Sequence, residues 1–241
     1  MKQGFIITLA ALLLLGACRR ANTENNEQSN KKNIEKAETR EQNIIRKRIS
    51  IPFDFSYITN LGSVDIIYTQ GSYAIEVEGD SATLTYLKAE FDSNLLTVSM
   101  QDDNNTDTNL FGNAGSVKMY VSAPHLKCVS ICGNGSFESQ ATWREEDIQL
   151  GVLSTGSMKI GRVECTTFNL QATHIGDVTL TDLHADDVTL YTRDAGNIDV
   201  NMDVKNLVII NEGEKKLHLK GKAGNVMVKM PNDMNLTNDL K

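Results

Sequence analysis

Between Gly133 and Leu219, apolar and polar residues alternate in short runs, and the runs recur at a nearly fixed interval. A glycine, a small polar residue and an apolar residue follow one another at four places, which begin at Gly135, Gly156, Gly176 and Gly196. Lys215-Lys216-Leu217 follows at about the same interval but contains no glycine. A fixed period of about 20 residues is typical of a solenoid, in which each repeat forms one coil.

Each repeat holds up to three places where apolar residues stand two apart, which is the spacing of a half-buried strand. The pairs are Met158/Ile160, Val178/Leu180, Ile198/Val200 and Leu217/Leu219, then Val163/Cys165 and Leu183/Ala185, then Phe168/Leu170, Val188/Leu190 and Val208/Ile210. Three short strands per coil, stacked about 4.8 Å apart, predict an all-β fold of the parallel β-helix type. We expect the repeat glycines to lie at bends that need a positive φ.

Two other architectures could produce similar patterns. A leucine-rich repeat has a similar length, but its framework of Leu and Asn residues is absent from this chain. An antiparallel meander is the main alternative, because Gly-Asp and Gly-Asn pairs also suit hairpins. The recurring intervals between apolar pairs favour the coil.

The region from residue 51 to residue 125 is less regular but still strand-like. Turns are expected at Gln70-Gly71 and at Asp92-Ser93-Asn94, and Leu84–Ala89 fits either a short helix or a strand. We interpret this region as the first coils and the N-terminal cover that a solenoid needs.

Residues 1–17 have the pattern of a secretory signal peptide, with Lys2 followed by an apolar run from Phe5 to Leu15. The run is too short for a membrane span, which needs roughly 20 apolar residues. Leu15-Gly16-Ala17-Cys18 resembles the bacterial lipobox, in which the chain is cut before the cysteine and the cysteine is acylated. The resemblance implies a lipoprotein anchored at Cys18, and two or three acyl chains would make the attachment stable.

A polar segment from Arg19 to about Arg48 follows and contains few aliphatic residues. We expect residues 18–48 to form a tether that is disordered or partly helical, with a charged helix over Lys31–Arg48 as the alternative. Residues 49–231 are then the β-helix domain, and residues 232–241 are a polar tail. In some bacterial lipoproteins an aspartate directly after the cysteine marks retention at the inner membrane. By that resemblance, Arg19 at this position implies the outer membrane, on its periplasmic or its surface side.

Composition narrows the possible partners. The net charge of −7 makes a nucleic-acid partner unexpected, because phosphate binding needs clustered Lys and Arg. Besides Cys18, three cysteines remain: Cys128, Cys132 and Cys165. The first two are too far apart along one strand to bond to each other. Cys165 could pair with either, but we expect three buried thiols that pack as small hydrophobes. The spacing does not suit a thiolate metal site, and no cofactor is expected.

The sequence contains no nucleophile elbow, zinc-protease helix or phosphate-binding loop. The strongest candidate for a binding site is a set of polar residues that recurs with the repeat. Ser154, His174 and Asp194 each stand two residues before a repeat glycine. Asp177 and Asn197 form a neighbouring column. Stacking on successive coils would bring His174 and Asp194 within hydrogen-bonding reach, although a solvated turn is the simpler interpretation. Another turn carries His184, Asp186 and Asp187.

The sequence also resembles the putative auto-transporter adhesin, head GIN domain family over about residues 50–230. The matching stretches are Phe53–Ile58, Val64–Gly71, Ile75–Asp80, Leu95–Val98, Val121–Leu126 and the glycine elements from Gly133 onward. The resemblance implies a right-handed, single-chain parallel β-helix of bacterial lipoproteins and no established activity. The family commonly repeats Gly-Ser-Gly-Asp, and Gly133-Asn134-Gly135-Ser136 is the closest match here.

Three functions follow as hypotheses. The first is a noncatalytic, lipid-anchored envelope protein whose β-helix binds an unknown protein or glycan. The second is a polysaccharide lyase, since such enzymes also use β-helices, although fold alone does not establish activity. The third is a scaffold that assembles through the strand-like end segment Gly224–Met230. Pro231 and the polar tail argue against assembly, because proline blunts a sheet edge.

Overall fold

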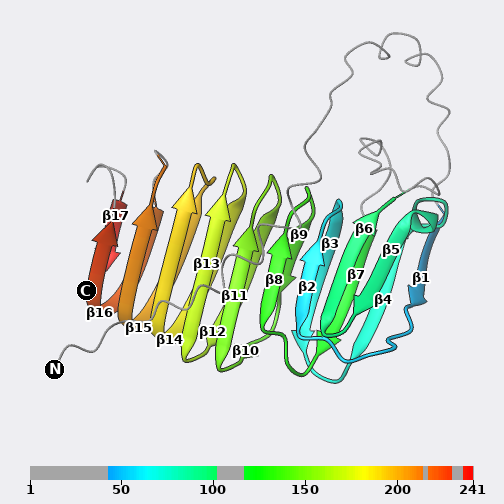
Figure 1. Cartoon of the computed structure of the whole chain (residues 1–241), viewed down its shortest axis with the longest axis horizontal. Coiled ribbons are helices and arrows are strands. Elements are labelled where there is room, and N and C mark those ends of the chain that lie inside the picture. The colour runs from blue at the N-terminus through cyan, green and yellow to red at the C-terminus, as the bar shows by residue number, and fades with distance from the viewer. Residues whose placement is uncertain (1–42, 102–116, 214–216, 230–235, 241) are drawn as a thin grey trace, which may run out of the picture. The chain divides into compact units, whose positions relative to one another are not determined.

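The computed structural model describes residues 43–101, 117–213, 217–229 and 236–240, which belong to one compact unit (Figure 1). The described residues form seventeen strands and a 3₁₀ turn, η2, at Thr83–Thr85. The strands are β1 (Ile44–Arg48), β2 (Tyr57–Asn60), β3 (Val64–Gln70), β4 (Ala74–Asp80), β5 (Leu87–Asp92), β6 (Leu95–Met100), β7 (Val117–Ala123), β8 (Cys128–Ile131), β9 (Ser136–Ser139), β10 (Trp143–Arg144), β11 (Asp147–Val152), β12 (Ser157–Glu164), β13 (Thr167–Thr173), β14 (Asp177–Arg193), β15 (Ile198–Asn211), β16 (Leu217–Lys229) and β17 (Leu236–Leu240).

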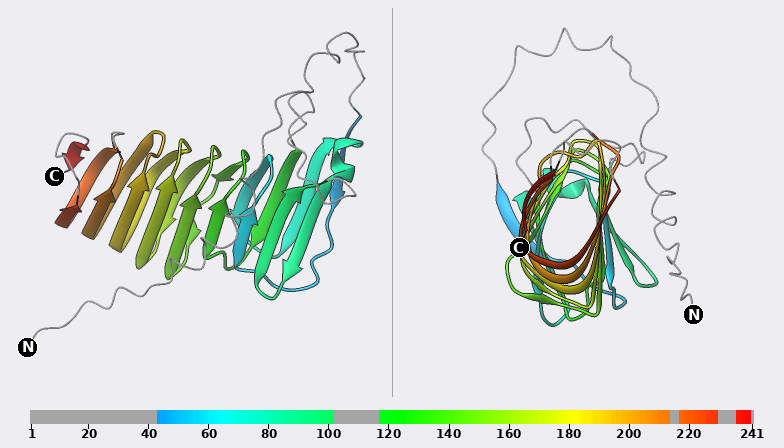
Figure 2. Two further views of the ribbon diagram at one scale, coloured as in Figure 1. Left: turned by 45° about the horizontal axis from the view of Figure 1, so that its top comes forward. Right: turned by 90° about the vertical axis from the view of Figure 1, so that its left-hand side faces the viewer.

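The strands stack into a parallel β-solenoid with about five turns over residues 128–229. Three columns of paired strands make up its faces, and the view along the stack shows the coils superimposed around one core (Figure 2). Column A contains, in spatial order, β1, β4, β7, β3, β9 and the first parts of β12, β14, β15 and β16, then β17. Column B contains β5, β6, β2, β8, β11, β13 and the last parts of β14, β15 and β16. Column C is short and contains β10, the last part of β12 and the middle parts of β14, β15 and β16.

The predicted period is confirmed by the pairing register. Ser157 lies beside Asp177 and Met158 beside Val178, with both pairs in parallel strands, so one coil corresponds to one sequence repeat. This pairing excludes the antiparallel meander for the coils. The alternation is confirmed too, because Met158, Val178 and their equivalents on each strand are buried while the residues between them face solvent. Burial of these columns of Val, Leu and Ile is the main stabilisation of the stack.

One predicted pair faces the wrong way. We expected Val208 and Ile210 to continue the inward column of Val188 and Leu190, but Leu207 pairs with Val188 and is buried instead. The register shifts between Leu180 and Leu183, where β15 takes one residue fewer than β14. A slip of one residue turns every following side chain to the opposite face. Val208 and Ile210 therefore lie on the outer side of column B.

The repeat glycines are explained by close packing rather than by φ. Among the described glycines only Gly221 has a positive φ, of 105°, so the expectation for the four repeat glycines is wrong. A Cβ at Gly176 would meet the side chain of Val152 and, at 2.8 Å, the carbonyl oxygen of Ser154. A Cβ at Gly196 would lie 2.6 Å from the carbonyl oxygen of Ile175. Glycine is needed because the corner of one coil touches the corner below it.

The N-terminal coils are stacked in an order that the sequence did not predict. β2 lies between β6 and β8, and β3 lies between β7 and β9, so the first coil of the chain is inserted between two later ones. β4 pairs antiparallel with β7, and β5 pairs antiparallel with β6. These antiparallel strands close the N-terminal end, which confirms a cover there. Leu84 lies in η2 and Leu87–Ala89 in β5, so both interpretations of that segment were partly right.

Both ends of the β-helix extend beyond the expected boundaries. Ile44–Arg48, which we assigned to the tether, form β1 and pair antiparallel with β4. Charge pairing accompanies this backbone pairing, since Arg46 and Arg48 each contact Glu76, at 2.8 Å and 3.0 Å. At the other end, Leu236–Leu240 of the expected polar tail form β17 and pair with β16. The signal peptide, Cys18 and residues 19–42 lie outside the described residues.

The cysteines differ in part from the expectation. Cys128 and Cys165 are both free thiols, so neither disulfide considered for Cys165 forms. Cys128 is buried, whereas Cys132 and Cys165 are only partly buried. Cys132 is disulfide-bonded rather than a free thiol, so the expectation of three buried thiols is wrong.

The close packing at the corners predicts that adding a methyl group to a repeat glycine destabilises the fold. Gly176→Ala should lower the free energy of unfolding by about 2–4 kcal/mol, because the methyl meets both a side chain and backbone. Gly161→Ala is the matched control, since its Cβ would make a single close contact, 3.3 Å from the Ser139 carbonyl oxygen. Urea unfolding midpoints would measure both. Equal midpoints for the two variants would contradict close packing at the corner.

Candidate functional site

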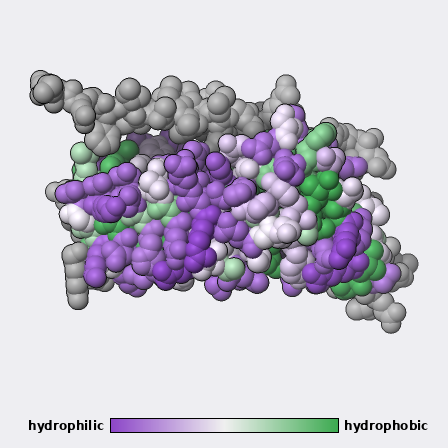
Figure 3. Space-filling model, turned by 90° about the horizontal axis from the view of Figure 1, so that it is seen from below, coloured by the Kyte–Doolittle hydropathy of each residue, from purple (hydrophilic) through white to green (hydrophobic). Residues whose placement is uncertain are grey.

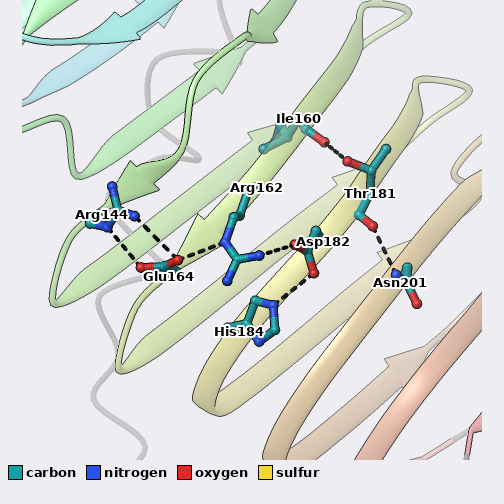
Figure 4. A network of polar contacts seen from close by, with 8 residues as sticks. All are labelled: Arg144, Ile160, Arg162, Glu164, Thr181, Asp182, His184 and Asn201. Carbon is teal, nitrogen blue, oxygen red and sulfur yellow. Dashed lines mark hydrogen bonds and ion pairs between the residues drawn. The ribbon is translucent and has the colours of Figure 1, made fainter.

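The outer side of column C carries a continuous row of charged side chains (Figure 4). Arg144 Nε donates to Glu164 Oε2 at 2.8 Å, and Arg162 Nε donates to Glu164 Oε1 at 2.7 Å. Arg162 Nη1 also donates to Asp182 Oδ2 at 2.7 Å. His184 Nε2 lies 2.9 Å from Asp182 Oδ1. One row thus links three strands, β10, β12 and β14, through alternating charges.

The coil period places these charges beside one another. Arg144 pairs in register with Glu164, and Arg162 pairs with Asp182, each one repeat further along the chain. The alternate residues on the same strands, Trp143, Val163 and Leu183, point inward and are fully buried. The buried side chains fix the strands, so the charged ones are held in position on the outside. Trp143 is therefore a core residue and is not available as a platform for sugar stacking.

The close contacts change the acidity of Glu164. Hydrogen bonds from Arg162 and Arg144 lower its pKa below the ordinary value, because they stabilise the carboxylate. The same contacts raise the pKa of the Arg162 guanidinium, chiefly through its hydrogen bond to Glu164. Between 33% and 61% of these side chains is exposed, so water screens the row. The row orders the surface more than it stabilises the fold.

A shallow depression of about 410 Å³ adjoins the row at the corner between columns C and B. Its lining is mainly polar and acidic: Glu164, Cys165, His184, Ala185, Asp186, Asp203, Val204 and Lys205. Lys205 Nζ lies 2.7 Å from Asp186 Oδ1. Asp203 pairs in register with His184, yet its carboxylate has no ion pair or hydrogen bond with any described residue. One carboxylate in the depression is thus free to bind a ligand.

The depression is not suited to thiol chemistry. Burial, together with the charges of Asp147 and Asp186, raises the pKa of the Cys165 thiol to about 12. A thiol of that pKa is protonated near neutral pH and is a weak nucleophile. Within the described part of the chain, no three His, Cys, Asp or Glu residues come together as a metal site would require. The arrangement is suited to hydrogen bonding and charge recognition.

The predicted column of Ser154, His174 and Asp194 does lie on successive corners. Among the described residues, no hydrogen bond or ion pair joins its members. His174 Nδ1 lies 3.3 Å from its neighbour Thr173 Oγ1. His174 and Asp194 have positive φ angles of 67° and 52°. Asp is among the residues that tolerate this conformation best. At His174 and Asp194, though not at Ser154, the column marks a left-handed residue two positions before the glycine.

The neighbouring pair, Asp177 and Asn197, makes a local contact. The Asn197 backbone N–H donates to Asp177 Oδ1 at 2.6 Å, from one coil to the next. This bond satisfies a backbone donor where the chain turns. Of the second predicted turn, Asp187 accepts a hydrogen bond from Asn206 Nδ2 at 2.7 Å, and Asn225 Nδ2 donates to Asn206 Oδ1 at 2.8 Å. Both contacts belong to the stacking of coils.

The charged row was missed from the sequence, although a signal for it exists. Arg144 and Glu164, and Arg162 and Asp182, are opposite charges separated by one period. None of these four residues lies close to a repeat glycine in the sequence, where the predicted polar column was sought. Comparing charges one period apart along the whole repeat would have found the row.

Comparison with known families identifies residues 54–181 as the domain described as "putative auto-transporter adhesin, head GIN domain". The match covers more than half of the chain and includes the N-terminal coils and the first coils of the regular stack. The chain belongs to this family. The resemblance seen in the sequence is confirmed. No protein of curated function matches the chain.

Solved structures of similar fold include proteins from Bacteroides and Parabacteroides species. The chain resembles a putative adhesin from Bacteroides fragilis, with a TM-score of 0.52, 18% identity and coverage of 78% of this chain and 94% of that one. A putative adhesin from Parabacteroides distasonis gives a TM-score of 0.53 and 15% identity, with coverage of 83% and 95%. A putative lipid binding protein from the same species gives 0.50 and 15%, with coverage of 83% and 97%. At these identities the likeness shows the fold alone.

The row predicts a linked pH effect. Because the folded-state pKa of Glu164 is lowered, its pairing stabilises the protein above the ordinary glutamate pKa and is lost as the pH falls through the lower folded value. Arg162→Gln should raise the pKa of Glu164, which NMR titration of the carboxyl carbons would measure. The stability difference from the parent should be present at neutral pH and vanish in acid.

Lys159→Gln is the matched control, since Lys159 lies on the same strand β12 and is exposed. It removes the same charge without removing a contact to Glu164. A Glu164 pKa that is the same in Arg162→Gln and in the parent would contradict the proposed cause.

Proposed function

We propose that this chain is a noncatalytic, lipid-anchored protein of the cell envelope, whose β-helix presents a surface for adhesion or for binding a protein or glycan. The observation that carries the proposal is membership in the adhesin family, which supports association with the envelope or cell surface. No helix among the described residues is long and apolar enough to cross a membrane. Attachment through Cys18 is the proposed alternative to a span.

The depression beside the charged row is the proposed ligand site. Asp203 supplies an unpaired carboxylate, and Lys205 and His184 supply donors close to it. Hydroxyl and amine groups of a glycan, or polar groups of a peptide, match such a set of donors and acceptors. The corner residues Ser154, His174, Asp194, Asp177 and Asn197 remain a second proposed binding surface.

The anchor predicts a clear change of location. Cys18→Ser should abolish acylation, since the sulfur that receives the lipid is gone, and should move the protein from the membrane fraction to the soluble fraction. Cell fractionation with labelled palmitate would measure both. Cys165→Ser is the control, because it removes a thiol without touching the proposed lipidation site. Continued palmitate labelling of the Cys18→Ser protein would contradict the anchor.

Binding is tested with a soluble form spanning residues 42–241, which contains the whole described core. A glycan and protein array should yield a ligand, and Asp203→Asn should weaken its binding about tenfold or more through loss of a charged hydrogen bond. Glu138→Gln, an outward-facing change on column A, is the charge-matched control. His174→Ala distinguishes the corner column as the binding surface.

Two outcomes would overturn this proposal. One is metal-dependent turnover of an acidic polysaccharide, which would support the lyase. The other is ligand binding that neither Asp203→Asn nor His174→Ala weakens, which would place the ligand elsewhere.

A further inference from the structure

The C-terminal end of column B leaves core positions uncovered. Val226 and Val228 of β16 are 45% and 44% exposed, whereas their partners one coil earlier, Leu207 and Ile209, are 1% and 0% exposed. The valines occupy the inward positions of the last coil, so the core meets solvent there. A solenoid needs a cover at such an end, because an open coil exposes apolar side chains together with backbone hydrogen-bonding groups.

β17 covers a different part of the same end. It pairs with Leu217–Gly221 in column A. Within the described ranges, no strand pairs with the free edge of Asn225–Lys229. Met227, whose side chain alternates with the two valines and points outward, is 59% exposed. The uncharged run Val226-Met227-Val228 on such an edge is a template for adding another strand.

The opposite end of the solenoid is finished differently. There β5 pairs antiparallel with β6 in column B, and β1 and β4 close column A. β1 carries Arg46, Lys47 and Arg48, and charged residues on an edge strand discourage strand addition. The two ends are therefore not equivalent: β1 sets three basic residues beside its exposed Ile44 and Ile45, whereas the described edge Asn225–Lys229 carries a single charge, on Lys229.

The open edge is complementary to itself. If two copies of Asn225–Lys229 pair antiparallel about Met227, then Val226 of one copy stands opposite Val228 of the other, and Asn225 stands opposite Lys229. No like charges meet, because Lys229 is the one charged residue in the segment. A two-fold axis perpendicular to the sheet keeps the inward faces of both strands on the same side, so the exposed valines of each copy would cover those of the other.

We infer that two copies of this chain associate tail to tail through the edge of β16 at Asn225–Lys229, which extends column B across the dimer. This pairing is closed: it uses the C-terminal end of both copies and leaves the N-terminal ends of the two solenoids pointing away from each other. It does not depend on which ligand the depression binds. It differs from an open scaffold, in which coils would add without limit.

The test uses the soluble form of residues 42–241 and places a cysteine at the centre of symmetry. In the dimer, residue 227 lies opposite itself, at a Cα separation of roughly 4.5–5.5 Å, which a disulfide can bridge. Met227→Cys should therefore give a covalent dimer under mild oxidation, with the 227–227 bond identified by peptide mass spectrometry. Ile175→Cys is the matched control, because Ile175 is 65% exposed and lies at a corner of the middle coils.

A change of charge at the same position provides a second, independent test of the dimer. Met227→Lys would set like charges directly opposite each other in the dimer alone, and should weaken association about tenfold or more. Ile175→Lys should leave it unchanged. Sedimentation equilibrium would measure both variants, and urea midpoints close to the parent would show that they fold. A monomeric parent protein, association unaffected by Met227→Lys, oligomers larger than two, or the absence of the 227–227 bond would each overturn the inference.

Discussion

The structure depends on one constraint: the backbone of each coil must stack on the backbone of the previous coil, about 4.8 Å away and in fixed register. At the corners this spacing leaves no room for a Cβ, as the close approaches of Gly176 and Gly196 to the corner below show. On the faces it places each side chain directly beside its equivalent one period away. Two like charges at that distance repel by roughly 1 kcal/mol even in water. Neighbouring coils therefore need opposite or neutral residues in each outward row.

The outward rows meet this requirement in two ways. On column C the signs alternate, from Arg144 to Glu164 and from Arg162 to Asp182. On column B, amides follow a carboxylate, from Asp187 to Asn206 to Asn225. Polar residues on the outside of this fold also serve the stacking itself. This requirement accounts for many of them without any ligand. The view of one face agrees, since hydrophilic residues dominate its middle and hydrophobic ones gather toward the end where the N-terminal strands lie (Figure 3).

The same constraint explains what the sequence could and could not predict. The regular coils were predictable because each inward column repeats locally, so the spacing of Met158 and Val178 predicts their pairing. The register shift that turns Val208 outward was not predictable. β15 has one residue fewer than β14 between the partners of Leu180 and Leu183, and this difference is visible only when the two strands are paired. The insertion of β2 and β3 between later coils was not predictable either, since strand pairing over such sequence distances leaves no periodic signal.

The candidate site shows the same division. Ser154, His174 and Asp194 were placed on one column correctly, because that column follows the repeat. No hydrogen bond joins His174 and Asp194 among the described contacts, which agrees with the solvated turn as the simpler interpretation, and both residues have a left-handed backbone. The charged row was not predicted because its residues lie away from the glycine phase, where the repeat is easiest to recognise.

Stacking also limits where a ligand can act. Rows held by buried partners such as Val163 and Leu183 are preorganised, so binding to them would cost little ordering of the backbone. Yet most charges on column C are already neutralised, and a ligand contacting Glu164 or Asp182 would have to displace an arginine that holds it at 2.7 Å. Such an exchange returns little free energy, because one charge-assisted hydrogen bond replaces another. New contacts gain most where the internal pairing stops. Among the described residues of this surface it stops at Asp203, which lies between His184 and Lys222 in register but forms no ion pair with either. That is the physical reason for placing the ligand in the depression and not along the row.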